Sequence, residues 1–200
     1  MAEPWVRFED EHLLVVAKPA GVNTHRADTH AQDGMYKWVQ RQRSDEPLSI
    51  LHRLDKATSG LLVFGRSPEA NRSLARQFEE RTVDKRYELL VPAGARRGGP
   101  MATCREPVGG QGAKTDFERQ AVGPRFEQYV AHPHTGRTHQ VRLHATALGM
   151  PIVGDREHHG IEAARLFLHA ASLAFEHPTA GRLEVAADRP ASFDRVLEGD

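Results

Sequence analysis

One stretch decides how the rest of the chain is interpreted, and it reads Leu51-His52-Arg53-Leu54-Asp55-Lys56-Ala57-Thr58-Ser59-Gly60. Apolar runs lie on both sides of it, at residues 48–51 and 61–64. Short apolar runs bounded by turn-forming residues indicate buried strands. A charged segment between two buried strands must reach solvent or be held by partners, because an unpaired buried charge is very costly.

The simplest interpretation of this stretch is a polar surface turn in which residues 58–60 reverse the chain. A turn explains the Ser and the Gly, but it does not explain three charged side chains beside His52. Loops that connect the strands of a rigid sheet frequently carry catalytic residues. The stretch therefore indicates a candidate functional site.

The composition is that of a soluble globular chain. Its 200 residues are 39% hydrophobic and 27% charged, which fits one domain with a sizeable core. No apolar run reaches membrane-spanning length, and the N-terminus lacks the features of a signal peptide. The single cysteine, Cys104, excludes an internal disulfide framework and fits a reducing compartment. We therefore expect a cytoplasmic monomer that does not bind membranes.

The charges are distributed unevenly, although the formal net charge is zero. Residues 36–150 hold nineteen Lys and Arg against twelve Asp and Glu, whereas both flanking segments are acidic. A mixed-charge solvated surface explains this pattern as well as an interface does. Together with the motifs below, a basic centre suits a face that contacts phosphates.

Local patterns predict an α+β fold with a mixed, mainly antiparallel sheet and flanking helices. Residues 1–10 are expected to form an irregular arm, residues 22–33 a loop, and residues 92–112 turns or an insertion. Helices are expected near residues 35–39, from Pro68 to Phe78, from a Thr138 cap to Gly149, and after Pro190. Strands are expected at 13–17, 48–51, 61–64, 85–91, 126–131, 166–175 and 183–187.

Residues 52–60 resemble the signature of the RluA-type pseudouridine synthases, which isomerise selected uridines in ribosomal or transfer RNA. Five further stretches fit the same family in the right order, so the resemblance covers nearly the whole chain. They are Lys18-Pro19-Ala20-Gly21, Lys85-Arg86-Tyr87, Gly136-Arg137-Thr138-His139-Gln140-Val141-Arg142-Leu143-His144, Pro151-Ile152-Val153-Gly154-Asp155 and, more weakly, Leu168-His169-Ala170.

The resemblance implies one pseudouridine synthase catalytic domain with RNA as the partner. The reaction breaks the C1′–N1 bond, turns the uracil and rejoins it through C5. Because no group enters or leaves and no redox change occurs, we expect neither an organic cofactor nor a metal. Many family members carry an additional N-terminal RNA-binding domain, for which residues 1–17 leave no room, so we expect none here.

The family assigns the chemistry to three residues. The aspartate of its signature is the catalytic one, which here is Asp55, and whether it attacks the base or acts at the ribose stays open. Arg142 is expected to pair with that carboxylate and keep it ionised. Tyr87 is expected to lie against the target uracil, because base stacking needs only an aromatic plane. A turn-capping Asp, a surface Arg and a core Tyr are the structural alternatives.

The resemblance points to Arg53 for base flipping, in which a planar cation fills the gap that the extruded uridine leaves. A structural ion pair is the alternative for Arg53. His52, Arg137, His139 and Gln140 are expected to help build the pocket or contact RNA.

Two other functions compete with this prediction. Twelve histidines suggest a metal-dependent hydrolase, because His132, His134, His139 and His144 lie close together and His158-His159 follow. No His-Glu-x-x-His or Cys-x-x-Cys spacing supports that function. A non-catalytic RNA-binding module is the better alternative, since the basic centre would serve binding alone. The combination of Asp55, Tyr87 and Arg142 favours the enzyme, although the sequence does not identify the RNA or the uridine.

Overall fold

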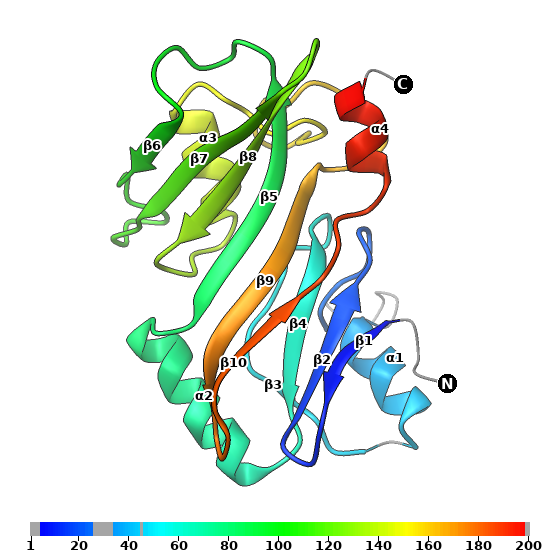
Figure 1. Cartoon of the computed structure of the whole chain (residues 1–200). Helices are drawn as coiled ribbons and strands as arrows, with labels where there is room; N and C mark the ends of the chain where they lie inside the picture. The colour runs from blue at the N-terminus through cyan, green and yellow to red at the C-terminus, as the bar shows by residue number, and fades with distance from the viewer. Residues whose placement is uncertain (1–4, 26–33, 45, 199–200) are drawn as a thin grey trace. The chain divides into compact units, whose positions relative to one another are not determined.

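The computed structural model describes residues 5–25, 34–44 and 46–198 (Figure 1). Most of the predicted loop at 22–33 lies outside the described residues. The chain divides into two compact units, residues 1–84 with 172–187 and residues 85–171 with 188–200. The expectation of a single catalytic domain stays a prediction. In the part of the chain that the structure describes, no helix is long and apolar enough to cross a bilayer.

The first unit is built around strands in the order β1-β2-β4-β9, with β3 beside β4 and β10 beside β9. The β1–β2, β2–β4, β3–β4 and β9–β10 pairs are antiparallel. Residues 172–177 of β9 belong to this unit, and residues 168–171 belong to the second. Its elements are β1 Val6–Glu9, β2 Leu13–Lys18, α1 Met35–Gln42, β3 Ser49–Ile50, β4 Ser59–Gly65, α2 Pro68–Glu80, β9 Leu168–His177 and β10 Gly181–Ala186.

The core of the first unit forms because β2 and β4 are apolar on both faces. Leu61 and Val63 pack with Ala70 and Leu74 of α2. Side chains alternate along a strand, so Phe64 points to the opposite face, where its ring meets Tyr36 of α1. Helix α2 begins where Ser67 caps it by accepting a hydrogen bond from the Ala70 N–H at 3.1 Å.

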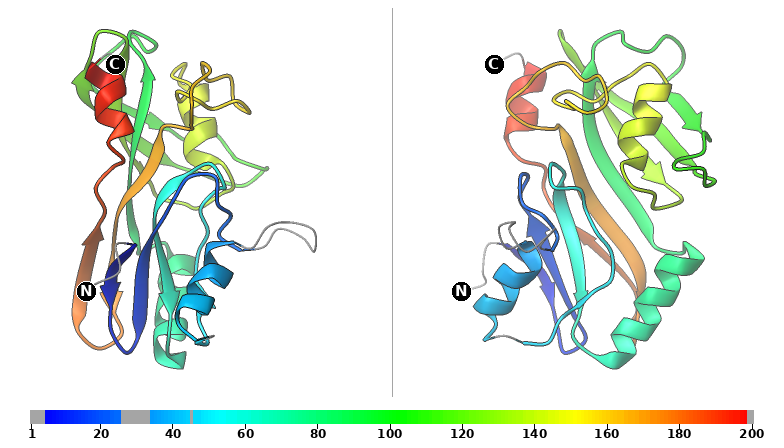
Figure 2. Two further views of the ribbon diagram at one scale, coloured as in Figure 1. Left: turned by 90° about the vertical axis from the view of Figure 1, so that its right-hand side faces the viewer. Right: turned by 180° about the vertical axis from the view of Figure 1, so that it is seen from behind.

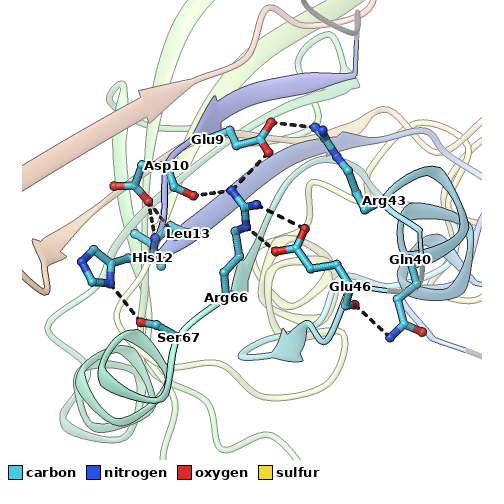
Figure 3. A network of polar contacts seen from close by, with 9 residues as sticks. All are labelled: Glu9, Asp10, His12, Leu13, Gln40, Arg43, Glu46, Arg66 and Ser67. Carbon is cyan, nitrogen blue, oxygen red and sulfur yellow. Dashed lines mark hydrogen bonds and ion pairs between the residues drawn. The ribbon is translucent and has the colours of Figure 1, made fainter.

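A network of charged side chains ties the end of β1 to the segments around β4 (Figure 3). Arg66 lies at its centre, and its guanidinium contacts Glu46 at 2.5 Å and Glu9 at 3.1 Å. Arg66 also donates to the Asp10 carbonyl, and Arg43 contacts the other side of Glu9 at 2.6 Å. These ion pairs hold the β1–β2 hairpin to the strand that follows the 51–58 loop.

The second unit is built on strands in the order β5-β8-β7-β6, each pair of which is antiparallel. Helix α3 lies against β6, β7 and β8 (Figure 2, right), and α4 packs against β8. Phe193 of α4 is fully buried against Leu90 and Phe167. The elements are β5 Asp84–Pro92, β6 Met101–Cys104, β7 Thr115–Val122, β8 Phe126–Pro133, α3 Gln140–Ala147 and α4 Ser192–Glu198.

The structure confirms the predicted α+β class with a mixed, mainly antiparallel sheet and flanking helices, and it corrects three local expectations. Residues 6–9, expected to be part of an irregular arm, form β1, because Val6 and Phe8 alternate with charged residues at a strand's period of two. Residues 101–104, expected within a loop or insertion at 92–112, form β6 on the edge of β7. Thr138 does not cap α3, since the N-cap is His139 in a left-handed conformation.

Candidate active site

A buried lysine, Lys18, makes hydrogen bonds that hold the loop at residues 51–58 in place. Lys18 ends β2, is 1% exposed, and donates from Nζ to the carbonyls of Val22 at 2.7 Å and Lys56 at 3.2 Å. It also donates to the Pro19 carbonyl at 3.0 Å. The Gly21 N–H donates to the same Lys56 oxygen at 2.8 Å. A buried ammonium needs such partners, and here they fix the residue directly after Asp55.

The residue before Asp55 is fixed as well. The hydroxyl of Thr24 donates to the Leu54 carbonyl and accepts from the Leu54 N–H, both at 3.0 Å. Thr24 is 3% exposed, so both bonds are sheltered from water. The Thr58 N–H donates to the Asp55 carbonyl at 3.1 Å and closes the turn. The backbone of Asp55 is therefore anchored on both sides.

His52 connects this loop to β4 and α2. Its Nε2 accepts a hydrogen bond from the Val63 N–H at 3.1 Å, and its ring stacks on Phe78 at 4.9 Å. Because Nε2 accepts, the ring proton must lie on Nδ1 in the neutral form. These two contacts join His52 to β4 and α2. Asp55 is half-buried, and the Arg53 side chain is exposed to solvent.

In the second unit, Gln140 joins the segment before α3 to the start of β7. It is 3% exposed, and its side-chain carbonyl accepts from the Thr135 hydroxyl at 2.6 Å and the Arg137 N–H at 3.1 Å. Its amide donates to the Lys114 carbonyl and the Thr115 hydroxyl, both at 3.0 Å. These four hydrogen bonds use both ends of the Gln140 amide, and its expected supporting role stays a prediction.

Lys85 links this junction to β5 by donating to the Thr135 carbonyl at 3.0 Å. Tyr87 lies two residues further along β5 and is half-buried opposite Ala131 of β8. Alternation along the strand places Lys85 and Tyr87 on one face. Arg137 is half-buried, and within the described residues its Nε atom has no hydrogen-bond partner.

Arg142 binds two carboxylates of the segment that follows α3. Its Nε and Nη2 atoms contact the two oxygens of Asp155 at 2.8 and 2.6 Å, and Nη2 contacts Glu157 at 2.5 Å. The side chains of Arg142 and Asp155 are 4% and 0% exposed. This bidentate geometry suits a guanidinium and fixes its plane.

Electrostatics keep this buried pair ionised. Burial opposes the charge on Asp155, but the hydrogen bonds and the positive charge of Arg142 outweigh it and lower the pKa of that carboxyl. Burial likewise opposes the charge on Arg142, and its bonds to Asp155 and Glu157 raise its pKa above the ordinary value. Both shifts therefore favour the ionised form of the pair.

The predicted site residues thus fall into two groups. His52, Arg53 and Asp55 lie on the 51–58 loop of the first unit, and the other five lie on β5 and around the start of α3 in the second. The pairing of Asp55 with Arg142 joins residues of the two units and stays a prediction.

Sequence reasoning missed the residues that hold these groups in place. Lys18 and Asp155 were recognised only as parts of motifs, without a role. A lysine directly after five apolar strand residues, at 13–17, was an available signal, because a charge there needs buried partners. Asp155 follows the apolar pair at 152–153 in the same way, whereas nothing local identifies Thr24 or Glu157.

Comparison with known proteins identifies the class that this fold and these motifs define. The sequence profile described as RNA pseudouridylate synthase matches residues 12–147. The chain therefore belongs to the RluA-type family of RNA pseudouridylate synthases, which are isomerases.

Similar proteins match over nearly the whole chain. The chain is 35% identical to the dual-specificity RNA pseudouridine synthase RluA of Escherichia coli (strain K12), covering 96% of this chain and 95% of that protein. It is 34% identical to the ribosomal large subunit pseudouridine synthase D of Pseudomonas aeruginosa, over 93% of this chain and 68% of the relative. The solved structure of human RNA pseudouridylate synthase domain containing 1 superimposes with a TM-score of 0.79 at 25% identity, covering 96% of this chain and 87% of the human one.

Proposed function

We propose that this synthase isomerises selected uridines in ribosomal RNA, transfer RNA or both, with Asp55 as the catalytic carboxylate. One relative is named a ribosomal large subunit enzyme and another a dual-specificity RNA enzyme. Ribosomal and transfer RNA are the substrate classes that the family resemblance implies. The proposal also includes action as a cytoplasmic monomer, which fits a free, buried Cys104. Light scattering on the purified protein tests the monomer.

The observation that carries the proposal is the anchoring of the backbone around Asp55. Both neighbours of Asp55 make backbone hydrogen bonds to buried groups, Leu54 to Thr24 and Lys56 to Lys18. A surface turn does not need a buried ammonium beneath it. A carboxylate that must reach one atom of a substrate does need a fixed backbone, since small displacements of reacting groups cost much of the rate.

The other residues take roles that match their chemistry. We propose that Arg142 pairs with Asp55 and keeps it ionised, and that Tyr87 stacks on the target uracil. The exposed guanidinium of Arg53 fills the gap left by the flipped uridine. We assign the half-buried Arg137 to RNA contact, while His52 and Gln140 hold the loops and His139 shapes the start of α3.

Tritium release from RNA labelled at uracil C5 tests this function directly, because forming the new carbon–carbon bond expels that hydrogen. Wild-type protein should release label from ribosomal or transfer RNA transcripts in the presence of a strong chelator, and the RNA should stay intact. Binding without release on every transcript would favour a non-catalytic RNA-binding module. RNA cleavage that the chelator abolishes would favour a metal-dependent hydrolase. Mapping of pseudouridine in total RNA with and without the protein then identifies the uridine.

A further inference from the structure

Two imidazoles and a carboxylate converge where α3 begins. Nδ1 of His139 lies 3.0 Å from Nε2 of His158 and 3.6 Å from Oε2 of Glu157. All three ligand atoms lie within 4.8 Å of one another. The sequence spacing hid this cluster, because Glu157 lies eighteen positions after His139, unlike the short spacing of a motif such as His-Glu-x-x-His.

These separations match those of ligands around one small cation. Zinc takes imidazole nitrogens and carboxylate oxygens at about 2.0–2.2 Å in a tetrahedron, so adjacent ligand atoms lie roughly 3.3 Å apart. The two separations to His139, 3.0 and 3.6 Å, bracket that value. One of the two facing nitrogens now carries the proton of their hydrogen bond; once that proton moves to the other nitrogen of its ring, both neutral imidazoles present a lone pair to a cation.

The backbone that carries the ligands is held in place. The His158 N–H donates to Asp155 at 3.2 Å, and the Thr146 hydroxyl donates to the His158 carbonyl at 3.0 Å. His139 is the N-cap residue of α3, with φ of 56°. The backbone positions of His139 and His158 are therefore fixed by contacts outside the cluster.

The surrounding charges favour a cation. Asp155 and Glu157 carry two negative charges, and Arg142 between them carries one positive charge. Arg142 donates to Oε2 of Glu157, the oxygen that also faces His139, and so fixes the position of this oxygen. The rim is open to solvent at Glu157, whose side chain is 63% exposed, so an ion and a water molecule can enter.

We propose that His139, Glu157 and His158 form a site for one divalent ion of the zinc class, with water as the fourth ligand. Two histidines and one carboxylate are a donor set that zinc accepts, and the borderline-soft nitrogen ligands disfavour magnesium and calcium. The ion joins the start of α3 to the segment after Asp155 and so acts as a brace. This inference rests on the geometry of the second unit and does not depend on the proposed RNA substrate.

Titration of the metal-free full chain with Zn²⁺ and with Co²⁺ tests the site without any activity assay. Wild type should bind one ion, and Co²⁺ should give the visible absorption of a tetrahedral nitrogen–oxygen site. His139→Ala and His158→Ala should each weaken binding more than about tenfold, as expected when one of three protein ligands is lost. Zinc should also raise Tm of wild type, since a ligand that binds only the folded state stabilises it.

His159→Ala is the matched control, because His159 is the exposed neighbour of His158 and lies outside the cluster. It should bind zinc like wild type. Glu157→Gln serves as a third ligand variant, and its side chain is too exposed for the change to unfold the protein. Circular dichroism of each metal-free variant checks the fold. Absence of zinc binding in wild type, or an equal loss in His159→Ala and His158→Ala, would overturn the proposal.

Discussion

At the residue scale, the buried guanidinium of Arg142 needs the Asp155 carboxylate to balance its charge. Because both side chains are buried, removing one partner leaves an uncompensated charge in the interior. Asp155→Asn keeps the shape and removes the charge, so it should lower the free energy of unfolding by about 3–5 kcal/mol. Glu157→Gln removes the exposed carboxylate from the same arginine and should cost less than about 1 kcal/mol. Urea unfolding of both variants measures the difference, and equal costs would contradict the assigned geometry.

The same pair predicts a dependence on pH. The pKa of Asp155 is lower in the folded chain than in the unfolded one, so its contribution is present above the unfolded value. As pH falls below about 4, the unfolded state binds the proton first, and the contribution is progressively lost. The stability difference between wild type and Asp155→Asn should therefore shrink in acid. A difference that stays constant from pH 7 to pH 3 would show that the ion pair is not its source.

Arg53 offers a test of base flipping. Its side chain is exposed, so Arg53→Ala should leave the stability within about 0.5 kcal/mol of wild type. Tritium release from a folded RNA should fall much more than release from a short unstructured RNA, whose uridine is already unstacked. Equal losses on the two substrates would assign Arg53 to a structural or direct chemical role.

At the scale of elements, the loop at 51–58 depends on the lysine that ends β2. Lys18→Met keeps the length of the side chain but removes the donor to the Val22 carbonyl and one of the two donors to the Lys56 carbonyl, the Gly21 N–H being the other. Each such loss costs roughly 1–3 kcal/mol, so the free energy of unfolding should fall by at least that amount. Isomerisation should fall further than RNA affinity, because the loop carries Asp55. The exposed Lys56→Met is the control for stability, and an equal loss there would contradict the bracing role.

Much of the secondary structure could be predicted from local pattern. Ala70, Leu74 and Phe78 recur at helical spacing after Pro68, and α2 follows them. The strands β2 and β4 follow from continuous apolar runs. The two missed strands, β1 and β6, are four residues long, and each pairs with a single neighbour. In such strands, pairing with the neighbour decides the conformation more than intrinsic propensity does.

A contiguous motif places His52, Arg53 and Asp55 on one loop, and their chemical roles stay predictions. The supporting residues were not predictable, because Thr24 reaches Leu54 across thirty residues and Asp155 reaches Arg142 across thirteen. The capping of α3 was missed for a related reason. The Gln140 side chain accepts a hydrogen bond from the Arg137 N–H and also bonds Thr135 and the distant Thr115. These contacts are not visible in the local sequence, and the helix begins after Thr138.

At the scale of the whole molecule, the basic segment at 36–150 should make RNA binding depend on salt. Phosphate neutralisation releases counterions. A protein with about 6–10 phosphate contacts loses about 10³–10⁵ in affinity between 50 and 200 mM salt. We expect a steep loss for this chain, measured by fluorescence anisotropy with a labelled ribosomal RNA fragment. Affinity that stays flat across that range would remove the segment from the RNA interface.

The central claim is that a carboxylate on an anchored loop carries out the isomerisation. Asp55→Asn is nearly isosteric and leaves the anchoring bonds of Leu54 and Lys56 in place, so the fold and most of the RNA affinity should persist. The decisive measurement is tritium release from C5-labelled RNA under single-turnover conditions, with wild type and Asp55→Asn matched for RNA occupancy. The account predicts release by wild type and none by Asp55→Asn. Release by Asp55→Asn at the wild-type rate would contradict it.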